Sequence, residues 1–152
     1  MKARVTTSIA LAFGLTMGMS GCTLITSQDT VGMQQSSYGV SGSVGKIDVR
    51  DAVIIATNNG NRGNLVATFI NNDDKAHYLE VQHGSTNKFV AIPAMGVKKI
   101  GARGGTRVEF NNLGARPGTL TNVYFTYAGA SGLQLRVPVL ATTFPGFQNY
   151  TP

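Results

Sequence analysis

The chain has 152 residues, enough for one domain of ordinary size. It is 42% hydrophobic and only 13% charged, which excludes a disordered protein, and its 19 glycines favour short strands joined by tight turns. The formal charge is +6, but Lys98-Lys99 is the only adjacent basic pair, so no nucleic-acid partner is expected. The single cysteine, Cys22, excludes an internal disulfide and a cysteine-rich metal site.

Residues 1–21 have the layout of a secretory signal peptide. Lys2 and Arg4 form a basic start, and residues 5–19 are uncharged and mainly apolar. Polar residues interrupt this stretch early, so it is too short for a spanning helix, which needs about 20 apolar residues. We therefore predict that residues 1–21 are cleaved, which leaves a mature chain with a mild attraction for anionic headgroups or wall polymers.

The end of this leader resembles the bacterial lipobox. Met19-Ser20-Gly21-Cys22 has Met where a Leu is usual, followed by two small residues and the cysteine. The resemblance implies that diacylglycerol is attached to Cys22 through a thioether and that Cys22, with further acylation by a chain such as palmitate, becomes the N-terminus. Two acyl chains give stable anchoring, so we predict a lipoprotein at the extracytoplasmic face of the cell membrane. The alternative is a secreted protein with a stray cysteine.

Residues 22–45 are rich in Ser, Gln, Gly and Thr and have no sustained hydrophobic period. This composition predicts a lipidated, flexible tether. Met33, Tyr38 and Val40 could instead dock on the domain that follows, and the sequence leaves this open.

Residues 46–152 are predicted to form a β-sandwich domain, because short alternating or apolar segments follow one another without a helical stretch. The spacing favours an all-β, Ig- or cupredoxin-like Greek-key β-sandwich of seven or eight strands. Pro138 cannot donate a ladder hydrogen bond, which predicts an edge strand or a bulge there. The expected strands are 46–50 running into 52–56, then 65–71, 76–82, 88–92, 97–100, 106–110, 119–128 and 133–139.

The C-terminal tail carries Phe144, Phe147 and Tyr150 at three-residue spacing. We expect these aromatic residues to fold back over one end of the sandwich rather than to form an exposed ligand platform.

The two histidines, His77 and His83, share a strand face with Leu79 and Val81. Six residues at about 3.3 Å each place the histidines roughly 20 Å apart, so one metal ion cannot bind both. Each could join other ligands, such as Met33 or Met95, in a soft Cu(I) site. We favour structural histidines over metal ligands.

Candidate catalytic groups are few. The only thiol is the predicted lipid attachment site, and most serines lie in the leader and the tether. The paired carboxylates Asp73-Asp74 fall in a turn that their own turn propensity explains. An enzyme, such as a hydrolase of wall polymers, is therefore not expected.

Several segments of the strand region resemble the periplasmic copper chaperone PCuAC family. With the lipobox and the ending Val137-Pro138-Val139, the whole is similar to the actinobacterial LpqE-type lipoproteins. The resemblance implies a cupredoxin-like β-sandwich. The matching segments are 67–72, 92–94, 104–110 and Gly118 before the Val-Tyr-Phe-Thr-Tyr strand at 123–127.

The copper-ligand motif of that family is not intact. The family binds Cu(I) with two His and two Met, the last pair arriving as His-x-Met in the strand after the Gly-Gly turn. That strand reads Arg107-Val108-Glu109 here, and arginine has no lone pair to offer a metal. Alternation predicts an exposed Arg107–Glu109 charged pair with Val108 pointing inward.

We therefore expect a surface-anchored, non-catalytic β-sandwich that binds another cell-envelope component, an unidentified protein or polymer, in addition to membrane lipid through Cys22. No cofactor or metal is expected. The alternative is a copper metallochaperone with a rearranged or degenerate Cu(I) site, for which His77, His83 and Met95 are the candidate ligands. The sequence predicts no particular residues for binding the envelope component.

Overall fold

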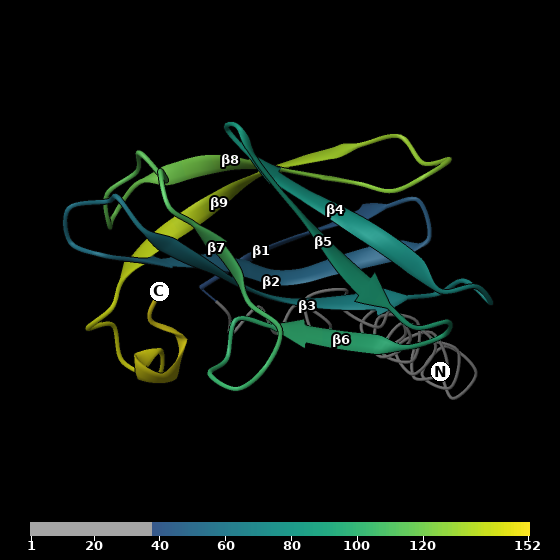
Figure 1. Cartoon of the computed structure of the whole chain (residues 1–152), viewed down its shortest axis with the longest axis horizontal. Coiled ribbons are helices and arrows are strands. Elements are labelled where there is room, and N and C mark those ends of the chain that lie inside the picture. The colour runs from purple at the N-terminus through teal and green to yellow at the C-terminus, as the bar shows by residue number, and fades with distance from the viewer. Residues whose placement is uncertain (1–37) are drawn as a thin grey trace, which may run out of the picture. The chain divides into compact units, whose positions relative to one another are not determined.

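A computed structural model describes residues 38–152 of the chain, and this part is almost entirely β-structure (Figure 1). Loops of two to nine residues join its nine strands, one more than the largest number expected, and the all-β sandwich class is confirmed. The strands are β1 (Val40–Val44), β2 (Ile47–Ala56), β3 (Gly63–Asn71), β4 (His77–His83), β5 (Thr86–Ile92), β6 (Val97–Ile100), β7 (Val108–Phe110), β8 (Leu120–Thr126) and β9 (Leu133–Ala141), and a short 3-10 helix, η2 (Gln148–Tyr150), follows them.

The nine strands are hydrogen-bonded in the order β5-β4-β8-β9-β2-β3-β6, with β1 added to β2 and β7 added to β3. Figure 1 shows β5, β4 and β8 in one layer and β2, β3 and β6 in the other. Strand β9 joins the two layers, because Leu133–Pro138 pair with β8, whereas its last residues pair in parallel with the end of β2. We call β5, β4, β8 and this first part of β9 the four-stranded layer.

The core lies between the layers and follows from strand alternation. Phe69 of β3 and Phe125 of β8 meet edge-on across it, with ring centroids 6.1 Å apart. Burial of each such side chain contributes roughly 1.5–3 kcal/mol. The largest fully buried side chains are Phe69, Phe110, Phe125, Ile47, Ile54, Ile55, Leu65, Leu79, Ile92, Val44, Val49 and Val53.

The domain begins earlier than the predicted boundary at Lys46. Residues 40–44 form β1, which pairs with β2, and Val44 is buried opposite Ile47. The prediction that the tether extends to residue 45 is therefore wrong at its C-terminal end. Val40 and Val44 pack against the core, but the Ser and Gly residues between them give no clear apolar alternation in the sequence. The predicted signal peptide, Cys22, Met33 and the rest of the tether lie outside the described residues.

Strand β2 contains a bulge where the sequence predicts a break between two segments. The register with β3 shifts between Arg50 and Val53, and Asp51 has a positive φ of 55°. Short polar residues such as Asp tolerate this conformation better than most. The bulge lies between Ile47–Val49, which pair with β1, and Ile54–Ala56, which pair with β9, and Ala52 within it pairs with Val40 of β1.

The expectation that Pro138 marks an edge strand or a bulge is wrong, because β9 pairs with strands on both sides. The N–H of Val139 donates to the carbonyl of Thr119 on the β8 side. Alternation therefore points the nitrogen of Pro138 toward β2, whose pairing with β9 starts only at Val139. A proline is tolerated at that junction because no ladder bond is due there.

The C-terminal tail folds back on the domain as expected. The rings of Phe144, Phe147 and Tyr150 contact one another in sequence, with centroids 6.1 and 5.7 Å apart. The buried Asn64 side chain on β3 donates to the carbonyl oxygens of Gly101 (2.7 Å) and Tyr150 (2.8 Å). Within residues 38–152, no helix is long and apolar enough to cross a membrane.

Candidate functional site

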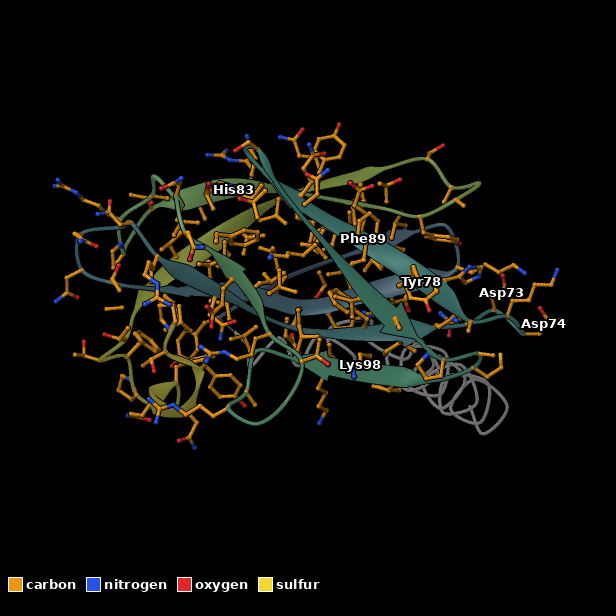
Figure 2. The ribbon with its side chains drawn as sticks, viewed as in Figure 1. Asp73, Asp74, Tyr78, His83, Phe89 and Lys98 are labelled. Carbon is orange, nitrogen blue, oxygen red and sulfur yellow. The ribbon has the colours of Figure 1, made fainter. Side chains whose placement is uncertain are left out.

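The two histidines occupy opposite ends of β4. His77 is the first residue of β4 and His83 the last. Figure 2 shows His83 at one end of the strand and Asp73 and Asp74 in the loop at the other end. Both are half-buried on the same side of the strand as buried residues, as alternation predicts. Strand length therefore keeps them apart, at about 20 Å along β4.

The His77 end is a hydrogen-bonded network centred on Asp73. The Asp73 carboxylate lies 2.8 Å from Nε2 of His77 and 3.0 Å from Nζ of Lys46. These two hydrogen bonds, His77 first, hold the pKa of Asp73 well below its ordinary value, and the same carboxylate raises the pKa of Lys46. The His77 ring also lies against Tyr127, with centroids 4.5 Å apart. Because a carboxylate only accepts, Nε2 is the donor in this contact, and the matching neutral tautomer has its lone pair on Nδ1.

Met95 belongs to the same end of the domain. Its N–H donates to the Asp73 carbonyl oxygen at 2.8 Å, and its backbone has a positive φ of 49°. Its side chain is exposed. Asp73 is thus contacted by the imidazole of His77 and by the backbone of Met95, whose thioether lies in the turn between β5 and β6.

His83 is engaged on both ring nitrogens. Nδ1 lies 2.8 Å from the carbonyl oxygen of Asn122, and Nε2 lies 2.8 Å from that of Leu113. Its ring contacts Phe110, with centroids 5.1 Å apart. The side chain therefore links β8 to the loop between β7 and β8, and both ring nitrogens already have a backbone partner.

The residues proposed for a rearranged Cu(I) site fit a metal only in part. His77 and Met95 both contact Asp73 in the loop before β4. His83 lies at the other end of β4, and both of its ring nitrogens contact backbone carbonyl oxygens. In the part of the chain from Tyr38 onward, no three His, Cys, Asp or Glu side chains gather as metal ligands would. A Cu(I) ion there would need a further soft donor.

The strand that carries copper ligands in the PCuAC family is occupied by an ion pair. Nη2 of Arg107 lies 2.9 Å from Glu109, whose other oxygen is 3.5 Å from Arg62, and Val108 is buried as predicted. The expectation of an exposed arginine is wrong, because Arg107 is only 29% exposed and also donates to the carbonyl oxygen of Thr151. The tail covers Arg107, and no local pattern in the sequence indicates that contact.

A second candidate site is the outward side of the four-stranded layer. Tyr78 of β4, Phe89 of β5 and Tyr124 of β8 are 72%, 66% and 46% exposed on this side. Figure 2 shows Tyr78 and Phe89 on the two neighbouring strands. The three rings make no aromatic contact with the rest of the described chain.

Polar side chains surround these rings, and most of them are uncharged. Cross-strand pairing places them all on one side of the layer, which we call the aromatic face. It consists of Asn87, Phe89 and Ala91 on β5, Tyr78, Glu80 and Gln82 on β4, Leu120, Asn122, Tyr124 and Thr126 on β8, and Gln134 and Arg136 on β9.

Sequence reasoning missed the aromatic face, although alternation already placed Tyr78 and Tyr124 opposite the inward residues of their strands. Only the pairing of β4 with both β5 and β8 brings these two rings onto one surface with Phe89. Monomeric proteins rarely leave several large apolar side chains together on one surface, and such patches mark binding sites.

Three solved structures share this fold. The chain has TM-scores of 0.54, 0.57 and 0.55 with a copper-bound PCuAC domain from PmoF2, an apo PCuAC domain from PmoF1 and an apo PmoF2 PCuAC domain. The alignments cover 67–68% of this chain and 97–99% of those domains, at 17–18% identity. No protein-family model and no curated protein matches the sequence. The expected PCuAC-like sandwich is thereby confirmed as a fold, and the resemblance to LpqE-type lipoproteins stays a prediction.

Proposed function

We propose that the chain is a non-catalytic binding domain, held at the extracytoplasmic face of the cell membrane by lipid on Cys22. In this proposal the aromatic face binds another component of the envelope. The observation that carries it is the grouping of Tyr78, Phe89 and Tyr124, exposed and without ring partners, on one side of the four-stranded layer. Aromatic side chains are enriched where proteins recognise partners.

The anchor and the binding face are tested separately. Cys22→Ser removes the thioether and should move the protein from the membrane fraction to the soluble extracytoplasmic fraction. A wild-type protein without lipid mass, or a Cys22→Ser variant that still sediments with membranes, would contradict the anchor.

Binding is tested with the Cys22→Ser chain on isolated cell envelopes. The triple variant Tyr78→Ala, Phe89→Ala, Tyr124→Ala should lose retention, while its melting temperature stays within about 2 °C because exposed substitutions change stability little. Val97→Ala, at an exposed valine of β6 in the other layer, is the matched control and should bind as wild type. Equal retention of the triple variant would contradict the proposed function.

A copper metallochaperone is the second candidate. It is favoured by the fold shared with PCuAC domains and by the Asp73–His77 hydrogen bond, because a carboxylate on one nitrogen orients a histidine for metal binding through the other. Titration of the whole chain with Cu(I) against a competing chelator tests this function. Tight one-to-one binding that is lost in both His77→Ala and Met95→Ala, and kept in His83→Ala, would support it over the binding face.

A further inference from the structure

The aromatic face has a regular arrangement of rings and hydrogen-bonding groups. Phe89 lies opposite Glu80, two residues along β4 from Tyr78, so these two rings are diagonal neighbours about 7–8 Å apart. Tyr124 lies opposite Gln82. Because β4 separates β5 from β8, Tyr124 stands about 10 Å across the sheet from Phe89 and about 7 Å along it.

Amide positions lie between Phe89 and Tyr124, whereas Glu80 and Ala91 separate Phe89 from Tyr78. Gln82 pairs across the sheet with both Asn87 and Tyr124, and Tyr124 pairs with Gln134. Each amide presents both a donor and an acceptor, and each tyrosine adds a hydroxyl. A partner protein with an apolar interface would favour contiguous apolar surface, whereas rings separated by amides match a ligand with apolar C–H faces and many hydroxyl groups.

The two charged side chains of the aromatic face, Glu80 and Arg136, differ in whether they have a partner. Glu80 accepts a hydrogen bond from Asn87 at 2.8 Å. Arg136, which lies opposite Asn122 and diagonal to Tyr124, has no acidic partner in residues 38–152. A free guanidinium binds carboxylate or phosphate groups through two parallel hydrogen bonds.

The net charge of the domain has the same sign. Of the 13 Lys and Arg and 7 acidic residues of the chain, only Lys2, Arg4 and Asp29 precede residue 38, which leaves an excess of five positive charges on the described part. A positive net charge raises the local concentration of an anionic polymer around the domain. Anchored through Cys22 as proposed, the domain would meet polymers near the membrane.

We propose that the aromatic face binds an acidic polysaccharide of the envelope, an inference that rests on the proposed function. Sugar rings stack their C–H faces on Phe89, Tyr78 and Tyr124, whose π-faces carry partial negative charge. The amides bind hydroxyl groups between the rings, and Arg136 binds an acid group of the polymer. Together, these contacts give preference for an acidic over a neutral polysaccharide.

The test measures binding of the Cys22→Ser chain to polygalacturonate, with dextran as the neutral probe, by affinity electrophoresis and calorimetry. Phe89→Ala and Tyr124→Ala should each weaken polygalacturonate binding about tenfold, the equivalent of about 1.4 kcal/mol. Arg136→Gln should remove the preference over dextran and reduce the dependence of binding on salt. Val97→Ala, outside the aromatic face, should bind as wild type.

Three results would overturn this proposal. The first two would keep the proposed function, and the third would reject it as well. Loss of envelope retention in the triple ring variant, without binding to either polysaccharide, would reject a polysaccharide and keep the binding face. Equal binding of both probes, unchanged in Arg136→Gln, would reject the acidic class alone. A dimer in light scattering that Phe89→Ala dissociates would assign the face to a second copy of the chain and reject both.

Discussion

The clearest stability prediction concerns Asn64, the buried amide that fixes the C-terminal tail to β3. Its Nδ2 donates at 2.7 Å to the carbonyl of Gly101 and at 2.8 Å to that of Tyr150, and its Oδ1 is buried without a partner in the described chain. Asn64→Ala removes both bonds. Each bond contributes about 0.5–1.5 kcal/mol net, and loss of the unpaired Oδ1 offsets part of that.

We therefore expect Asn64→Ala to lower the free energy of unfolding by about 1–2 kcal/mol, which for a domain of this size lowers the melting temperature by about 4–8 °C. Thermal unfolding followed by circular dichroism measures this shift. Release of the tail should also speed carboxypeptidase digestion from Pro152.

Two further variants separate the hydrogen bonds from the loss of a side chain. Asn64→Asp keeps the shape but turns a carboxylate toward two carbonyl oxygens, so it should destabilise more than alanine does. Asn111→Ala, at an exposed position, should leave the melting temperature unchanged. If both Asn64 variants melt like wild type, this amide does not hold the tail.

The other predictions concern charged groups and the core. Arg107→Ala should lower the free energy of unfolding in urea by about 1–2 kcal/mol, because it removes the contacts with Glu109 and with the tail. Arg50→Ala, at an exposed arginine paired with Asp48, should lower it by well under 1 kcal/mol. Equal effects of the two substitutions would contradict a stabilising role for the partly buried Arg107. Because the pKa of Asp73 is lowered on folding, its contribution is complete above the unfolded value of about 3.9 and is lost as pH falls below it. Urea midpoints of wild type should therefore fall from pH 5 to pH 3 more than those of Asp73→Asn, and parallel profiles would show that Asp73 has no such role. Val108→Asp should unfold the domain at 25 °C by circular dichroism, because it buries an unpaired carboxylate; a folded variant would mean that the strand faces the other way.

The positions of the two histidines and of Val108 could be predicted from the sequence, but the aromatic face could not. Alternation placed His77 and His83 on the inward side of one strand, too far apart for one metal, and placed Val108 in the core. The contacts that use up both nitrogens of His83 could not be predicted, because Leu113 and Asn122 are far from it in the chain. The coverage of Arg107 by the tail escaped prediction for the same reason.

The sequence by itself determined the class of the domain and most of its strands, because period-two alternation and turn residues are local signals that a half-buried sheet requires. It missed β1, whose residues alternate only weakly and become a strand by pairing with β2. Only the tertiary structure decided which strands are neighbours. The order β5-β4-β8 sets Phe89, Tyr78 and Tyr124 on one face. The β4–β5 hairpin is a local pairing, but no local pattern encodes the pairing of β4 with β8, because it joins residues far apart in the chain, such as Gln82 and Tyr124.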